Sequence, residues 1–311
     1  MRYLRIKYND GGKNNMSREK ITFNKFHGIK DDSYVDINLE KDMLLFIDPS
    51  RLKLVDNSNF NAVKADLKVK NYYKEAIDSY RNGYKEKALQ LIGHDGELSQ
   101  LGFGYSQHDL NGNGATPKML DKVFQKIVES PKILEDGLTS EGIIFHLFTD
   151  NFGPDRFSDL NGSIIKQELV KFTQSIVKKY GLEVTEVNLG KGYNMESKRW
   201  ETITADLPIG LNGKGVLLCP KEIAVESYDH SIEKYMSIAI YPRLKTYHFN
   251  AGTPGLRNFN RKQEPTEATN EMIKDYEIRG QYTFKEFALT YTLDNPWILP
   301  DYLKKLDRKI K

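Results

Sequence analysis

One segment, residues 141–181, most constrains the fold, because it runs from apolar residues through a polar loop into a helical pattern. That pattern spaces apolar residues by threes and fours, which predicts a long helix with one buried face over residues 159–180. Its apolar positions are Leu160, Ile164, Ile165, Leu169, Phe172, Ile176 and Val177. Gly181 is the expected stop, and Lys178 and Lys179 precede it where cations complement the helix dipole. A helix with a single apolar face has to pack on a second layer.

The polar loop before this helix, residues 150–159, carries most of the candidate chemistry. Asp155 and Asp159, with Arg156 beside the first, follow a Gly-Pro turn. Paired carboxylates with open coordination are how proteins bind Mg²⁺ for phosphodiester chemistry. The structural alternative is that Ser158 or Asp159 caps the helix while Asp155 and Arg156 hold the turn. The sequence leaves both interpretations open.

Two further charged residues complete the candidate site. Glu97 lies in the stretch 93–106, where His94 and Asp95 follow a helix end and glycines alternate with apolar residues. Glycines in such positions favour close backbone approach to a strand or a ligand. Lys221, just after an apolar segment, is placed to stabilise a developing charge. For both Glu97 and Lys221 the alternative is an ordinary solvated side chain.

The composition fits a globular protein with a sizeable core. The chain has 311 residues, 39% of them hydrophobic, which is enough for one large domain or two. Its net charge of +3 gives no global signature of polyanion binding. No signal peptide is recognisable and the apolar runs are only a few residues long, so we expect a cytoplasmic protein with no membrane partner.

The single cysteine, Cys219, excludes an internal disulfide framework and a cysteine-ligated zinc site. It ends the apolar segment 216–219, which we interpret as a strand. We therefore predict that Cys219 is buried and unreactive.

Short apolar segments alternate along the chain with long one-sided helices, which predicts an α/β fold, or a mixed α+β variant of it, with helices flanking a sheet. Residues 43–47 and 216–219 are expected in that sheet, and the helices over 61–92 and 159–180 are expected to pack on it. Asn82-Gly83 would split the first helix in two. Further strands are expected at 2–8, 21–26 and 182–189, and further helices at 117–129, 223–236 and 265–279.

Asp48 and Pro49 stop the strand at 43–47. We interpret Asp48 as a turn initiator, the alternative being a catalytic carboxylate at a strand end. The predicted domains are a mixed α/β core over residues 1–240 and a loop-rich and helical extension over residues 241–311, packed on the core. Within the extension, residues 245–263 form either a loop or a surface that faces nucleic acid.

Four segments together carry a resemblance. They are LLFIDP at 44–49, ELSQLGFGYS at 97–106, FGPDRFSDL at 152–160 and LPIGLNGKGVLLCPK at 207–221. Over residues 40–225 the chain resembles an uncharacterised family of bacterial proteins found near phage-defence genes and mobile elements. The resemblance implies a restriction-endonuclease-like fold of the PD-(D/E)XK type. The chain departs from that signature, since it has no clear (D/E)-x-K on a strand that follows an Asp-bearing strand.

Two functional hypotheses follow. In the first, the protein is a bacterial antiviral-defence nuclease or phosphodiesterase that depends on Mg²⁺. Asp155 and Asp159 hold the metal with Glu97 nearby, and Arg156 and Lys221 stabilise the charge that develops. In the second, it is a non-catalytic component that binds nucleic acid or other defence-system proteins, and the acidic loop is structural. Convergence of these side chains on one cleft favours the first, and carboxylates that cap a helix favour the second.

Overall fold

The computed structural model describes residues 20–94, 96, 98–104, 115–130 and 142–310. Over these residues the fold is mixed α/β, dominated by helices, as predicted. The helices are α1 (Phe23–His27), α2 (Ala62–Arg81), α3 (Lys85–Ile92), α4 (Pro117–Val128), α6 (Ile143–Phe148), α7 (Pro154–Ile164), α8 (Lys166–Tyr180), α9 (Ile232–Tyr235), α10 (Tyr241–Ala251), α11 (Asn270–Glu277), α12 (Phe284–Asp294) and α13 (Ile298–Ile310). None of these described helices is both long and apolar enough to cross a membrane.

The strands of the described part form three separate two-stranded antiparallel sheets. They are β1 (Phe46–Ile47) with β4 (Ala224–Val225), β2 (Val184–Asn194) with β3 (Arg199–Pro208), and β5 (Arg257–Phe259) with β6 (Pro265–Glu267). The β2–β3 hairpin contains the strand predicted at 182–189 and packs against α7 and α8. The restriction-endonuclease-like arrangement stays a prediction.

The helix predicted over 159–180 is two helices, and its predicted start was wrong. α7 begins at Pro154, because proline at the first helical position fits the required φ and lacks only an N–H that would be unpaired anyway. Ile165, with φ −92° and ψ 12°, then interrupts the helix before α8. The apolar residues of both helices from Leu160 to Ile176 are buried, and Gly181 ends α8 in the left-handed conformation, as predicted.

The α2–α3 pair confirms the helical pattern read from residues 61–92, including the break at Asn82-Gly83. Its tyrosines Tyr72 and Tyr73 are fully buried, as core residues at helical spacing should be. α4 also appears as predicted, with Thr116 capping the amide of Met119.

The prediction that residues 216–219 and residues 43–47 lie in one sheet was wrong, because residues 216–219 form no strand and β1 pairs with β4. The segment from Val216 to Cys219 is buried, but its backbone groups bond to four separate parts of the chain. Val35 N donates to Cys219 O at 3.0 Å, and three amides of the segment donate elsewhere. Val216 N donates to Pro208 O at 2.9 Å, Leu217 N to Gln100 O at 2.9 Å, and Leu218 N to Thr173 Oγ1 at 2.9 Å. Cys219 is buried, as predicted, and burial raises the pKa of its thiol.

Three other element predictions were also wrong. Residues 21–26 contain α1, capped by Thr22, and not a strand. Residues 223–236 hold the end of a 3₁₀ turn, η4 (Lys221–Ile223), then β4 and finally α9, which Ser231 caps. The helix expected from 265 begins only at Asn270, because Thr269 caps it there. The strand expected at 2–8 lies outside the described residues.

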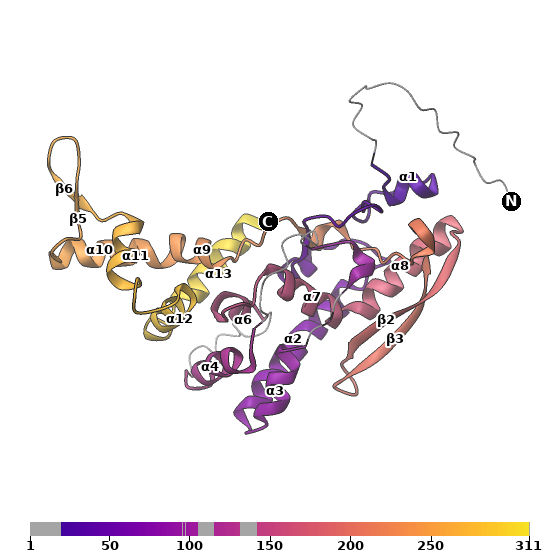
Figure 1. Ribbon diagram of the computed structural model, residues 1–311, viewed down its shortest axis with the longest axis horizontal. Coiled ribbons are helices and arrows are strands. Elements are labelled where there is room, and N and C mark those ends of the chain that lie inside the picture. The colour runs from indigo at the N-terminus through magenta and orange to yellow at the C-terminus, as the bar shows by residue number, and fades with distance from the viewer. Residues whose placement is uncertain (1–19, 95, 97, 105–114, 131–141, 311) are drawn as a thin grey trace.

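The C-terminal helices form the second half of an elongated molecule (Figure 1). α9 continues through a π-helical turn, Met236–Ile240, into α10, so the chain is helical through residue 240. α12 packs on α6 and so joins these helices to the first half. The division into domains at residue 240 stays a prediction.

Candidate functional site

The candidate carboxylates lie on α7 and not in a loop. Asp155 is in the first turn, where a negative charge complements the helix dipole. Asp159 follows one turn later, so both side chains are on the same side of the helix. Neither Asp159 nor Ser158 is the N-cap residue, which is Gly153. The capping interpretation of these two residues was therefore wrong.

A neighbouring segment, residues 93–104, lies along α7 and encloses this side of it. Arg156 Nη2 donates to Gly93 O at 3.0 Å, and Ser163 Oγ donates to Gly96 O at 3.4 Å. Gly104, at φ +123°, is so close that a Cβ built on it would lie 2.8 Å from Asp155 Oδ1. Gly104 N also donates to Met43 O at 3.0 Å, and Gly102 O accepts from Met43 N at 2.8 Å. These glycines therefore approach another backbone segment closely, as in the first of the two alternatives that we expected.

Glu97 itself is outside the described residues, but both of its sequence neighbours contact α7. Gly96 accepts the bond from Ser163, and the Leu98 side chain packs on Gly162, where an added Cβ would lie 2.2 Å from Leu98 Cδ1. The structure thus brings the segment that holds Glu97 to the helix that holds Asp155 and Asp159. It does not describe where the Glu97 carboxylate lies.

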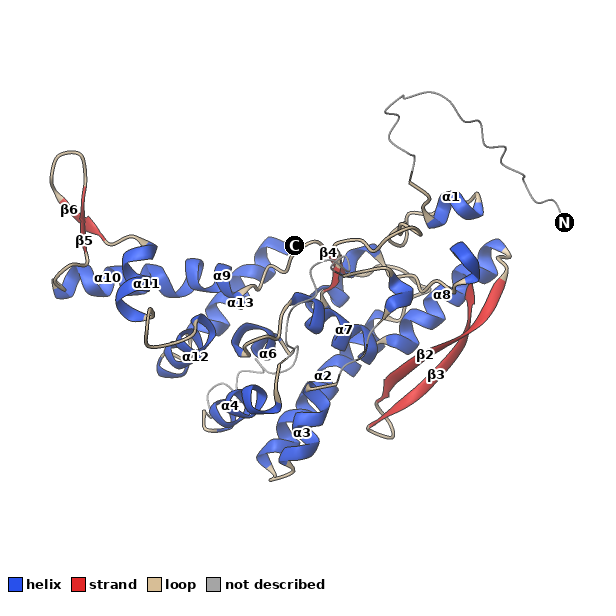
Figure 2. Ribbon diagram, viewed as in Figure 1, coloured by secondary structure: helices blue, strands red, loops and turns tan. Residues whose placement is uncertain are grey.

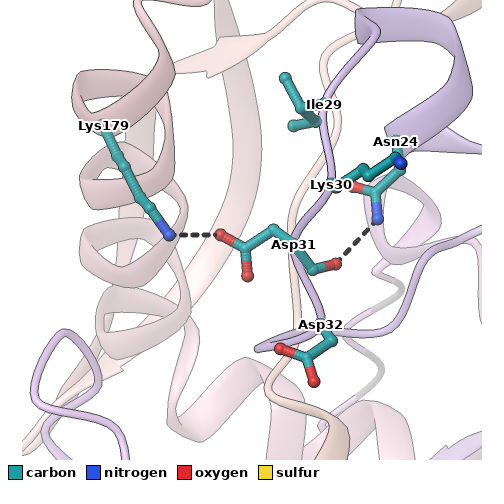
Figure 3. Close-up of a pocket in the computed structure, with 6 residues that line it drawn as sticks. All are labelled: Asn24, Ile29, Lys30, Asp31, Asp32 and Lys179. Carbon is teal, nitrogen blue, oxygen red and sulfur yellow. Dashed lines mark hydrogen bonds and ion pairs between the residues drawn. The ribbon is translucent and has the colours of Figure 1, made fainter.

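Lys221 lies elsewhere, in the turn η4. Its Nζ is 3.3 Å from Asp32 Oδ2, and this is the ion pair that it forms within the described residues. Asp32 lines a surface pocket of about 470 Å³ with Asp31 and Lys179 (Figure 3). The Asp31 carboxylate in that pocket is already satisfied, since it accepts from Lys179 Nζ at 2.8 Å and from Tyr180 Oη at 3.0 Å.

A buried cluster that the sequence did not reveal lies on the other side of α7. His146 from α6 stacks on Phe157 of α7 with ring centroids 5.0 Å apart, and its centroid is 5.7 Å from that of His230. Tyr228 stacks on His230 at 4.9 Å and donates its hydroxyl to Ile47 O at 3.0 Å and to Pro154 O at 3.2 Å. In the sequence, the only indication of this cluster was that His146 and His230 lie within or beside apolar segments.

This cluster fixes α7 against β1. Ser158 Oγ accepts from Ile47 N at 2.9 Å, which ties the buried side of α7 to the strand. Asp48, next along the chain, accepts from Ser50 N at 3.0 Å and Ser50 Oγ at 2.6 Å. Asp48 thereby caps the following 3₁₀ turn, which confirms its interpretation as a turn initiator.

The first residue of α8, Lys166, is buried, and the charge of Asp159 acts on it. Lys166 Nζ donates to Leu189 O and to Lys191 O, each at 2.6 Å, and so fixes the β2 strand. Burial lowers the pKa of Lys166 to about 8, and the carboxylate of Asp159 opposes that shift. Asp159 therefore contributes negative charge to a region where positive charge is poorly solvated.

The donor set on α7 fits some metals and not others. In the part of the chain that the structure describes, no group of three or more His, Cys, Asp or Glu side chains is arranged to hold a metal ion. Asp155 and Asp159 therefore do not form a closed site of the kind that structural zinc requires. Mg²⁺ keeps several waters and is held by one or two carboxylates together with substrate phosphates, so two carboxylates one turn apart fit it.

The protein is therefore a helix-rich mixed α/β protein. Two of its carboxylates, Asp155 and Asp159, lie on one side of α7, and the glycine-containing segment 93–104 packs against that side. Residues 26–231, which include α7 and the buried histidines, match the family described as a domain of unknown function (DUF8370), and the chain belongs to this family. No curated protein and no solved structure matches the chain.

Proposed function

We propose that the protein is a Mg²⁺-dependent phosphodiesterase or nuclease whose metal-binding residues are Asp155 and Asp159. The observation that carries the proposal is that Asp155 and Asp159 lie one turn apart on the same side of α7, with Gly104 packed closely against Asp155. Asp155, one turn earlier, provides a second oxygen ligand on the same side. Mg²⁺ bound there supplies Lewis-acid stabilisation of the charge that develops on a phosphodiester oxygen.

The remaining residues shape the site. Arg156 keeps the segment 93–104 on α7 through its bond to Gly93 O and adds positive charge beside the two carboxylates. Glu97, in the same segment, is the proposed third carboxylate. Lys221 has no part in this version of the site, because it is paired with Asp32.

The proposed setting is a bacterial antiviral-defence system in the cytoplasm, with nucleic acid as substrate and other proteins of the system as partners. Its support is the sequence resemblance over residues 40–225. The test of this setting is phage plating on a bacterial host. We expect fewer plaques on a host that expresses the wild-type chain than on a host that expresses the Asp155→Asn, Asp159→Asn double variant. Equal plaque counts for both proteins and for the empty host would contradict this setting.

The biochemical test is cleavage of DNA and RNA in the presence of Mg²⁺ or EDTA. We expect Asp155→Asn and Asp159→Asn each to abolish cleavage while leaving the melting temperature nearly unchanged, because asparagine keeps the shape and removes one negative ligand. Mg²⁺ should raise the melting temperature of the wild type and not that of the double variant. Asp66→Asn with Asp78→Asn on α2 is the matched control and should leave cleavage unchanged.

A double variant on α7 that still cleaves with Mg²⁺ would rule out these carboxylates. If the wild type does not cleave and Mg²⁺ does not raise its melting temperature, the results favour the alternative function, that of a non-catalytic binding component. The observation in favour of that alternative is that Arg156 is held by the chain's own backbone.

A further inference from the structure

The β5–β6 hairpin projects beside α10 at the left end of the molecule in Figure 2. Its strands pair in the register Arg257 with Glu267 and Phe259 with Pro265. All residues from 257 to 267 are exposed except Thr266, which is half-buried. A two-stranded hairpin has little stability without packing, so an ordered hairpin with both faces in solvent needs specific support.

That support comes from the base and the tip. At the base, Leu256 and Ala268 are buried, and Thr246 Oγ1 on α10 donates to Glu267 Oε1 at 2.7 Å. At the tip, Asn260 Oδ1 accepts from Lys262 N at 2.8 Å and from Glu264 N at 3.0 Å. The turn is therefore ordered by its own side chain, which leaves the long side chains around it available.

The available side chains are cationic and aromatic. Arg257, Arg261 and Lys262 are exposed, and none of them forms an ion pair with another described residue. The two carboxylates of the hairpin are each hydrogen-bonded, Glu264 Oε2 to Asn260 Nδ2 at 2.6 Å and Glu267 to Thr246.

Two aromatic rings accompany these cations. Phe259 is 56% exposed on β5, and Tyr247 is 65% exposed on α10, directly after the Thr246 that contacts β6. Phe259 shares the hairpin with three cations that form no ion pair with a described residue, and both carboxylates of the hairpin are hydrogen-bonded to uncharged side chains. This combination of exposed rings and cations suggests a contact surface.

We propose that this surface, consisting of Arg257, Phe259, Arg261, Lys262 and Tyr247, binds single-stranded nucleic acid. This assignment rests on the proposed function and adds the form of the substrate. Backbone phosphates pair with the cations, and unstacked bases stack on the two rings, which is the combination that single-strand binding uses. Arginine and aromatic residues also occur in protein–protein interfaces, so a protein partner is the alternative, and failure of the wild type to bind any single strand would favour it.

The hairpin lies far along the molecule from α7, on the other side of α10 and α12 (Figure 1). It therefore contributes affinity and not chemistry. A strand that reaches both surfaces must be long, so cleavage of long substrates should depend on the hairpin more than cleavage of short ones.

The test is binding of the full-length protein to fluorescent single strands of DNA and RNA, longer than about 16 nucleotides, and to a duplex, measured by anisotropy in EDTA. Without metal there is no cleavage, so the result does not depend on the chemistry at α7. We expect a preference for single strands. Replacing Arg257, Arg261 and Lys262 together by Gln should lower the salt slope by about 2, since each lost phosphate contact removes about 0.7.

Phe259→Ala should weaken single-strand binding about tenfold, because one stacked base is lost. The matched control replaces Lys70, Lys74 and Lys85 by Gln. These are exposed cations of α2 and α3 that are paired with Asp66, Asp78 and Asp121, and the substitution should leave the salt slope unchanged.

The hairpin assignment is overturned if the wild type binds no single strand, or if the triple hairpin variant and the triple control variant bind equally. It is also overturned if the duplex is preferred. The Asp155→Asn, Asp159→Asn variant separates the two proposals: it should bind like the wild type in EDTA and fail to cleave. If the wild type binds no single strand but Mg²⁺ still raises its melting temperature, the result counts against the hairpin proposal and not against the metal site on α7.

Discussion

His146 and His230 are buried among aromatic rings, and their protonation bears on the stability of the whole chain. His146 Nδ1 and His230 Nε2 have no hydrogen-bond partner among the described residues. Burial lowers the pKa of both imidazoles, so each is neutral in the folded protein near neutral pH. The charged groups around the pair are Asp48 and Asp229, which favour protonation, and Lys234 and Lys285, which oppose it.

We therefore expect the free energy of unfolding to fall as pH falls below about 6.5, the ordinary pKa of histidine. The unfolded chain binds these protons and the folded one does not, so stability is present above that pH and is lost below it. Each histidine contributes a slope of at most about 1.4 kcal/mol per pH unit. Urea titrations between pH 5 and 8 should show this loss for the wild type and a flatter profile for His146→Gln, His230→Gln.

His248 provides the control for that experiment, because its Nε2 lies 2.6 Å from Glu277 Oε1. His248→Gln should therefore keep the loss of stability caused by the other two histidines. Identical pH profiles for the wild type and the His146→Gln, His230→Gln variant would contradict the prediction.

The residues of the candidate site were predictable to the extent that they are close in sequence. Asp155, Arg156 and Asp159 lie within one turn of helix, and their proximity needed no tertiary information. The Tyr228–His230 pair reaches α7 from a distant part of the chain, and no pattern in the sequence records that contact. Lys221 forms an ion pair with Asp32, which is equally remote in sequence, and no local pattern records that pairing.

At the scale of elements, α2 and α8 are joined by a buried ion pair. Lys68 Nζ lies 3.2 Å from Glu168 Oε2, with both side chains almost fully buried. Burial lowers the pKa of Lys68, and the adjacent carboxylate opposes the shift. Such a pair adds little net stability, but removing one partner leaves an uncompensated charge in the core.

Lys68→Met should therefore lower the free energy of unfolding by about 3–5 kcal/mol, whereas Lys68→Met with Glu168→Leu should cost much less. Chemical denaturation of both variants measures the difference. The exposed pair Lys70 and Asp66 on the same helix is the control, and Lys70→Met should cost at most about 1 kcal/mol. A double variant no more stable than Lys68→Met would count against the argument.

Some helix boundaries that local signals define were predicted, although the caps at Thr22 and Thr269 were missed. Elements that distant partners define were not predictable. The break at Asn82-Gly83 and the stop at Gly181 each act within a turn, and each was predicted correctly. β1 and β4 are two residues long and exist because they pair with each other. The segment 216–219 depends on hydrogen bonds to four separate parts of the chain, which no periodicity encodes.

At the scale of the whole molecule, one lysine ties the C-terminal helices to the region of the candidate site. Lys285 Nζ on α12 donates to His146 O at 2.7 Å, Thr149 O at 2.8 Å and Phe152 O at 3.4 Å. These carbonyls are at the end of α6 and just before α7, where a cation also complements the dipole of α6. Burial lowers the pKa of Lys285 to about 8, and the charges of Asp150 and Glu233 oppose that shift.

Lys285→Met should weaken this connection, because methionine keeps the apolar stem and removes every donor to the three carbonyls. Leaving buried carbonyls unpaired costs about 1–3 kcal/mol each, so we expect a loss of several kcal/mol. Because the loss falls at the contact between the two halves, thermal unfolding should separate into two transitions. Proteolysis should then cut near the start of α9 first.

The control is Lys122→Met, which removes an exposed ion pair with Glu286 across the same contact and should cost at most about 1 kcal/mol. A single transition at the wild-type temperature for Lys285→Met would show that the halves are held together by other contacts.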